Sequence, residues 1–591
     1  MRIRALGTIL LGLTAAVPLA GGLAHAQSQD QAKSSPELAA EAAPAIPEAS
    51  QEAAPVAAAP EGAPAAAPVA MPPAAPEPGL SAPSDATPEP AATEIAPAPA
   101  DQSQAAAPPP ALQADPVVAA IRAKLADPAA AKDAHPDDRV ALTDFYAARE
   151  GAPLWITEMG FSAKGQQVLF EIEKAGDWGL DAASFALPRS DALTTTPEAQ
   201  ADAEIALDLA LLKYARYASG GRFTPSKVSA LFDQAPPVRD PKTVLADIAA
   251  AEAPDDYLRS LHPKHEQFMR LREALLKARG GNAEGAEPAA DGKDVKRILI
   301  NMERWRWMPE NLGSVYVLNN SAAFMLYVVK DNKTIYADKT LVGTIGYATP
   351  IFSSPMTTIV FNPDWNAPET VVKENILPAL QSKKFSILKT HKLFVSYNGQ
   401  PIDATKVDWN RVNGLAYTFS QKAGPHNNLG KVKFLYPNRH TVYMHDTLPV
   451  RKKYFKKSAR LIGHECVRME KPDKFAAVLL AESNGVTEAR VKELWNKGNN
   501  ASVALERKIP VHMVYFTAVA DDGGKVEAFT DVYGLDRKLA AKMFGDATGF
   551  PEPPPESKEP PPGETEASTP AARRTTADND MARAMSGFLG E

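Results

Sequence analysis

The chain has 591 residues, enough for two or three domains, and a formal net charge of −7. A small negative charge spread over this length offers no basic surface of the kind that nucleic-acid-binding proteins need, so we predict no nucleic-acid partner. The sequence contains one cysteine, which excludes an internal disulfide.

The first 26 residues have the pattern of a secretory signal peptide. Arg2 and Arg4 precede an apolar run, and the segment ends in Ala24-His25-Ala26, a small-x-small cleavage pattern. An uncleaved anchor is the alternative, although the apolar run is short for a membrane span. We therefore predict export to the periplasm, with no stable membrane span after signal cleavage.

Composition and periodicity divide the rest of the chain into five parts. Residues 27–112 are rich in Ala and Pro and predict a disordered linker. Residues 113–280 carry apolar side chains at three- and four-residue spacing, which predicts a helical domain. After a short linker at 281–294, residues 295–545 show strand and turn patterns with a few helices, and residues 546–591 predict a disordered tail. The predicted fold class is α+β, a helical domain followed by a mainly-β domain.

The most informative chemistry lies late in the second domain. His445 ends an apolar strand pattern, and Cys466 follows it after a basic segment, residues 451–460. A cysteine nucleophile needs a thiolate, which a nearby imidazole can generate and nearby cations favour. A backbone carbonyl or Asp446 would orient the imidazole, and peptide N–H groups beside Cys466 would stabilise an oxyanion.

Two other interpretations of these residues stay open. Cys466 could be a small buried core residue near an unrelated histidine. A metal site made of His440, His445, His464 and Cys466 has suitable ligand types but lacks the compact spacing of common zinc sites. We predict an enzyme with no metal and no other cofactor.

Two sequence stretches, YMHDT and SARLIGHECVRMEKP, resemble the active-site segment of L,D-transpeptidases with the YkuD-type catalytic domain. Other stretches are similar to the large periplasmic murein L,D-transpeptidases, among them TPIFSSPMTTIVFNPDWNAPETV and, in the helical half, KYARYASGGRFTPSKV. The resemblance covers roughly residues 113–540. It implies a helical scaffold domain followed by a mainly-β YkuD-like catalytic domain.

The resemblance also implies a reaction in cell-wall biogenesis. The Cys466 thiolate would attack the amide before the terminal D-Ala of a peptidoglycan tetrapeptide stem and form a thioester. A side-chain amine of a neighbouring stem would then resolve the thioester into a 3→3 cross-link. His445 would be the general base, a mobile cap would span about residues 371–408, and carbapenems would label the cysteine.

Further site residues are expected on the same resemblance. His464 would act as a second base or an oxyanion donor, and Arg468 is the arginine that follows the cysteine in the family pattern. The expected substrate-binding residues are Arg468 and Tyr443, together with Asn427, Gly430, Lys433 and Trp365, for which a purely structural role stays open.

Glu465 departs from the family pattern, which has Gly immediately before the cysteine, and Gly463 stands where the family has Ser or Thr. A carboxylate beside the thiol would raise its pKa if it points inward. Three functions follow, with transpeptidation first. The others are a hydrolase on the same fold, either an L,D-carboxypeptidase or an amidase, and a catalytically silent peptidoglycan-binding scaffold. We predict a monomer that acts on stem peptides.

Overall fold

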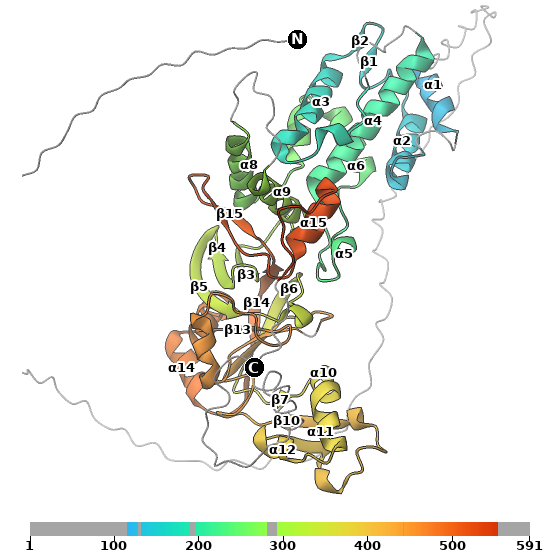
Figure 1. Ribbon diagram of the computed structural model, residues 1–591. Helices are drawn as coiled ribbons and strands as arrows, with labels where there is room; N and C mark the ends of the chain where they lie inside the picture. Colours follow the sequence, from blue (N-terminus) through green and yellow to red (C-terminus); the bar gives the residue numbers. More distant parts are fainter. Residues whose placement is uncertain (1–114, 128–131, 189–195, 281–291, 441, 554–591) are drawn as a thin grey trace, which may run out of the picture. The chain divides into compact units, whose positions relative to one another are not determined.

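The computed structural model describes residues 115–127, 132–188, 196–280, 292–440 and 442–553. The predicted signal peptide, the predicted Ala/Pro-rich linker and most of the predicted tail lie outside these residues. The described part confirms the predicted fold class, because a helical region precedes a mainly-β domain (Figure 1).

The helical region is organised around one long central helix. Asp115, Thr196 and Asp240 cap the first turns of three of its helices, each with a proline among the first helical residues, where a missing N–H costs nothing. The central helix α4 contacts α1, α2, α3 and α6. The elements are α1 (Pro116–Leu125), α2 (Pro136–Ala148), β1 (Ile156–Thr157), β2 (Gly160–Phe161), α3 (Ala163–Glu173), α4 (Pro197–Gly220), α5 (Pro225–Val228), α6 (Pro241–Ala250), α7 (Pro254–Ser260) and α8 (Glu266–Ala278).

Two buried carboxyl groups lie at the centre of this region. Glu204 and Asp208 project from α4 and have no exposed surface. The Tyr146 hydroxyl donates to both, at 2.7 and 2.9 Å, and the Trp155 indole N–H donates to Asp208 at 2.7 Å. Burial raises the pKa of both carboxyl groups, and the charge of Glu204 raises that of Asp208 further.

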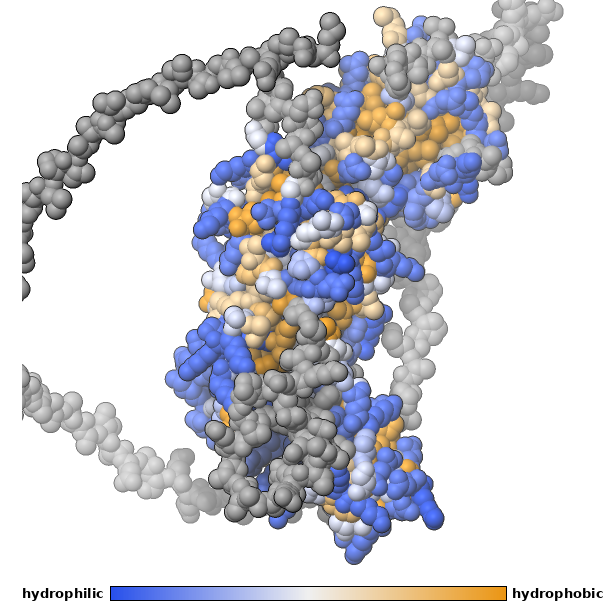
Figure 2. Space-filling view, viewed as in Figure 1, coloured by the Kyte–Doolittle hydropathy of each residue, from blue (hydrophilic) through white to orange (hydrophobic). Residues whose placement is uncertain are grey.

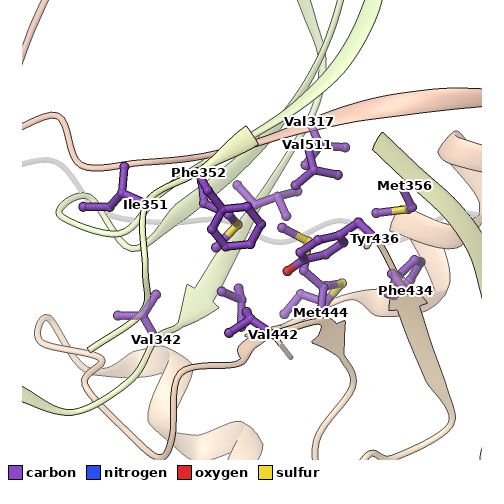
Figure 3. Packing of buried hydrophobic residues seen from close by; sticks show 14 of the residues in the cluster. Val317, Val342, Ile351, Phe352, Met356, Phe434, Tyr436, Val442, Met444 and Val511 are labelled. Atoms are coloured by element: carbon purple, nitrogen blue, oxygen red, sulfur yellow. The ribbon is translucent and has the colours of Figure 1, made fainter. Parts of the chain in front are cut away.

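The second domain contains a closed eight-stranded barrel in the order β11-β12-β13-β5-β4-β3-β14-β6. Alternate residues of the strands fill its interior, where Val317, Phe434, Met444 and Val511 pack together (Figure 3). The pairs β12–β13 and β14–β3 are parallel and the other pairs antiparallel. The strands are β3 (Val315–Asn320), β4 (Met325–Lys330), β5 (Lys333–Leu341), β6 (Ser353–Phe361), β11 (Val432–Leu435), β12 (Met444–His445), β13 (Val467–Met469) and β14 (Ala501–Val514).

Helix α9 (Lys293–Arg306) occupies the start of the segment predicted as mainly β. Its Arg304 is buried and pairs with Asp536 at 2.7 Å, while Arg222 of the helical region pairs with Glu303 at 3.3 Å. This helix therefore contacts both halves of the chain. The remaining elements around the barrel are η8 (Pro449–Lys456), α13 (Pro472–Asn484), α14 (Glu488–Asn496), β15 (Ala518–Ala520), β16 (Val526–Ala528) and α15 (Leu535–Phe544).

Residues 365–421, which we call the cap, are inserted between β6 and β11. The cap has its own sheet in the order β7-β10-β8-β9 and its own apolar core. It extends beyond the predicted 371–408 on both sides because β7 pairs with β10. Figure 2 shows a mainly hydrophilic surface over it. Its elements are β7 (Trp365–Asn366), α10 (Glu369–Val371), η5 (Val372–Ile376), α11 (Leu377–Gln381), α12 (Ser386–Thr390), β8 (Phe394–Tyr397), β9 (Gln400–Pro401) and β10 (Tyr417–Gln421).

None of the helices in the described ranges combines the length and the hydrophobicity that crossing a membrane requires.

The buried carboxyl pair predicts a pH-dependent stability. A carboxyl group whose pKa is raised in the folded state stabilises fully below its unfolded pKa of about 4, and this contribution is lost as pH rises through the folded pKa. We expect Asp208→Asn, which removes this titration, to raise the free energy of unfolding of the helical region by about 1–2 kcal/mol at pH 8. Thermal unfolding followed between pH 4 and pH 8 measures this gain, which should shrink towards zero at pH 4.

The control is Asp202→Asn on the exposed side of the same helix, which should show no such trend. An equal gain for Asp208→Asn at every pH would contradict the assignment.

Candidate active site

The parallel pair β12–β13 determines which side chains share the outer face of the barrel. Met444 pairs with Val467 and His445 with Arg468. Met444 and Val467 both lie in the barrel core. Since successive residues of a strand face opposite sides, His445 and Arg468 face outward, and Cys466, two residues before Arg468, begins on the same side.

Cys466 directly precedes β13, and ideal strand spacings would put its Cα atom about 8 Å from that of His445. The part of the chain that the structure describes contains no hydrogen bond between the sulfur and the imidazole ring. Catalytic hydrogen bonds are often long without substrate. Tyr443 lies beside both residues: its carbonyl accepts from the Val467 N–H at 3.3 Å, and its ring centroid is 5.7 Å from that of His445.

The His445 ring is held in its neutral form. The side chain is buried, and burial lowers its pKa well below the usual value. The positive charges of Arg468 and Lys433 lower the pKa further, while the carbonyl groups of Asp446 and Leu429 oppose this shift. A neutral imidazole is able to accept the thiol proton.

The Cys466 thiol is half-buried, and burial raises its pKa. The Tyr443 backbone and Arg468 lower this pKa, while the Glu465 carboxylate raises it. Opposite shifts of the thiol and the imidazole favour a neutral pair at rest over a thiolate–imidazolium pair. Ionisation of the sulfur would therefore accompany substrate attack rather than precede it.

The basic segment at 451–460 does not act on the thiol. Arg460 donates to the carbonyls of Thr340 and Phe324, and Lys452 pairs with Asp446 at 3.6 Å. The expectation that this segment would lower the thiol pKa is wrong, because its charges are used to hold neighbouring segments. Arg468 is the cation that lowers it.

Asp446 fixes the turn that leads into β11. Its carboxylate accepts from the Lys431 N–H at 3.0 Å, and a Cβ atom on Gly430 would overlap with it. Gly430 also has φ +61°, a conformation that favours glycine. The carboxylate of Asp446 thus faces the turn, and it is the main-chain carbonyl of this residue that acts on the His445 ring.

Three predicted groove residues occupy different positions. The Asn427 amide donates to the Pro363 carbonyl at 2.9 Å and anchors the base of the cap. Trp365 is buried in the cap core. Lys433 lies opposite His445 in the β11–β12 pair. The fold accounts for Asn427 and Trp365 structurally, and Lys433 lies beside His445.

A segment before β6 supports the residues that precede the cysteine. The His464 ring stacks on Tyr347 with centroids 3.9 Å apart, and burial lowers the His464 pKa to about 4. The Thr349 hydroxyl donates to the Glu465 carbonyl at 2.9 Å across 116 residues of sequence. No sequence pattern pointed to Tyr347 or Thr349, because both act through contacts distant along the chain.

In the described ranges, no three His, Cys, Asp or Glu side chains are placed to hold a metal ion together.

Known proteins match both halves of the chain. Residues 140–275 match the family model of the Scaffold domain, and residues 314–497 match that of the L,D-transpeptidase catalytic domain. A putative L,D-transpeptidase of Haemophilus influenzae is 30% identical over 246 residues, which are 42% of this chain and 49% of that protein. The chain thus spans about half the length of this relative.

Among solved structures, an L,D-transpeptidase from Mycobacterium smegmatis aligns with 34% of this chain and 58% of its own, at 9% identity and a TM-score of 0.17, too low to support an argument. The matches of the two family models instead correspond to the two structural regions described above. The chain therefore contains a Scaffold domain in its helical region and a YkuD-type L,D-transpeptidase catalytic domain in its barrel and cap.

Proposed function

We propose that the protein is a peptidoglycan L,D-transpeptidase in which Cys466 is the nucleophile and His445 the general base. The observation that carries this proposal is the β12–β13 register, which pairs His445 with Arg468, two residues after Cys466. The lowered imidazole pKa leaves His445 neutral and able to accept the thiol proton, while the raised thiol pKa keeps that proton on the sulfur until substrate attack. Export to the periplasm, where peptidoglycan is assembled, is part of the same proposal.

The first half-reaction forms a thioester. His445 takes the Cys466 proton as the sulfur attacks the amide carbonyl before the terminal D-Ala of a tetrapeptide stem. The Val467 N–H is already bonded to Tyr443, so the amides of Glu465 and Cys466 are the candidates that stabilise the oxyanion. As the intermediate collapses, the carbon–nitrogen bond breaks, and His445 returns the proton to the departing D-Ala amine.

The second half-reaction forms the cross-link. A side-chain amine of a neighbouring stem attacks the thioester, His445 takes a proton from that amine, and the sulfur leaves and is reprotonated. The products are a 3→3 amide bond and the free thiol, so no oxidant or cofactor is consumed. Arg468 holds the segment that precedes the cysteine, since its guanidinium donates to the Ile462 carbonyl at 2.9 Å.

Hydrolysis is the second candidate, and Glu465 favours it. Burial raises the pKa of this half-buried carboxyl group, which stands next to the nucleophile. A carboxylate in that position is suited to activating water against a thioester. The product would then be a tripeptide stem instead of a cross-link.

The reaction is tested with a disaccharide-tetrapeptide substrate and mass spectrometry. We expect a cross-linked dimer with loss of D-Ala, and Cys466→Ala should reduce turnover by at least about 1,000-fold because the nucleophile is gone. A circular dichroism spectrum identical to that of the parent checks that the variant folds. Tripeptide alone would indicate hydrolysis, and full activity of Cys466→Ala would contradict the mechanism.

The charge of Glu465 predicts a shift in thiol reactivity. Because this carboxylate raises the thiol pKa, Glu465→Gln should lower the thiol pKa and move the pH profile of Cys466 alkylation by iodoacetamide to lower pH. Glu527→Gln, an exposed carboxylate on β16, is the control and should leave the profile in place. An unchanged profile in Glu465→Gln would show that this carboxylate does not act on the sulfur.

A carbapenem should acylate Cys466, since the proposed mechanism provides an activated thiol next to an oxyanion site. Intact-mass spectrometry should find one adduct in the parent protein and none in Cys466→Ala. A parent protein of unmodified mass after long incubation would count against an activated thiol.

A further inference from the structure

Tyr347 makes two contacts that join the cap to the residues before the nucleophile. It ends η4 (Ile345–Tyr347), between β5 and β6. Its hydroxyl donates to the carboxylate of Glu374 at 2.6 Å, and Glu374 lies on η5 of the cap. Its ring stacks on His464, with an interplanar angle of 25°, two residues before Cys466.

The segment that carries Tyr347 also holds the residues from Gly463 to Glu465. The Thr344 N–H donates to the Gly463 carbonyl at 2.9 Å, and the Thr349 hydroxyl donates to the Glu465 carbonyl at 2.9 Å. Tyr347 lies between these two anchors in the sequence. A displacement of its ring would therefore be transmitted to the turn that positions the sulfur.

The base of the cap is held mainly by the main chain. The Asn362 N–H donates to the Lys431 carbonyl at 2.7 Å, and β7 pairs with β10. By contrast, the Tyr347–Glu374 bond joins two side chains, and Glu374 is exposed. Exposed hydrogen bonds between side chains stabilise little and break easily. The main-chain bonds at the base of the cap are therefore stronger than the Tyr347–Glu374 bond at its other side.

Other contacts place the cap next to the catalytic face. Tyr443, the neighbour of Cys466, packs against the apolar core of the cap. His391 of the cap is largely buried, and the charge of Arg451 on η8 contributes to lowering its pKa to about 4. Glu374 itself lies in a π-helical turn, a rare conformation that often occurs at functional sites.

We propose that Tyr347 is a positioning residue that couples the cap to the catalytic turn. While Glu374 accepts its hydrogen bond, the ring stays on His464 and the cap stays against the face that carries Cys466. A stem peptide reaches the sulfur when the Tyr347–Glu374 bond breaks and the cap moves away. The identity of that peptide rests on the proposed function. The control of access to the Cys466 sulfur does not depend on the proposed function.

The test uses alkylation of the full-length protein by iodoacetamide, because Cys466 is the one cysteine of the chain and gives a single product. Tyr347→Phe keeps the stacked ring and removes the hydroxyl donor. We expect its alkylation rate to rise about three- to tenfold, as expected for the loss of one hydrogen bond that holds the cap closed. Glu374→Gln should also raise the alkylation rate. The variant that carries both substitutions should react only slightly faster than the faster of the two single variants, because both remove the same bond.

Two control variants make the same chemical changes, Tyr to Phe and Glu to Gln, at other positions of the cap. Tyr397→Phe removes the hydroxyl of an exposed tyrosine of the cap, and Glu369→Gln removes a cap carboxylate that pairs with Lys373. Neither should change the rate. The pH profile separates access from thiol chemistry, since a change in access raises the plateau rate and leaves the midpoint in place.

The inference is overturned if Tyr347→Phe alkylates at the parent rate, if the midpoint alone shifts, or if the effects of the two single variants add fully. Because alkylation needs no peptidoglycan, its outcome is separate from that of the cross-linking assay. A protein that forms no cross-link can still show the coupling, and a protein that cross-links can lack it.

Discussion

The parallel pairing of β12 with β13 is the constraint on which the rest of the site depends. Two short strands bring together residues that are about twenty positions apart in sequence and fix which of them face outward. The barrel core holds the pair in register, because Met444 and Val467 are packed inside it. A slip by one residue would turn His445 inward and place a polar ring in an apolar interior.

Burial gives this site a particular resting state. Desolvation disfavours charge on both partners, so the thiol holds its proton and the imidazole stays neutral. Such a pair is less reactive towards adventitious electrophiles than a standing thiolate.

Sequence patterns predicted the local features well. The three- and four-residue spacing identified the helical region, and the apolar strand pattern that ends at His445 corresponds to β12. The patterns failed where contacts distant in sequence decide the structure. Helix α9 opens the segment that the pattern indicated as mainly β, and the two-residue pairing of β7 with β10 makes the cap wider than predicted. The charge state of the Cys466 thiol depends on burial, and the support that Tyr347 gives to His464 depends on a tertiary contact. Neither can be read from the local spacing of residues.

The position of the cap in the chain has a consequence for how the fold tolerates change. β6 and β11 are adjacent antiparallel strands, with Phe361 opposite Val432, so the cap occupies the place of an ordinary hairpin connection. Both ends of the insertion leave the barrel side by side. The cap is therefore a module whose size and surface can diverge without cutting any barrel strand, so related chains can present different entrances over the same sulfur and imidazole.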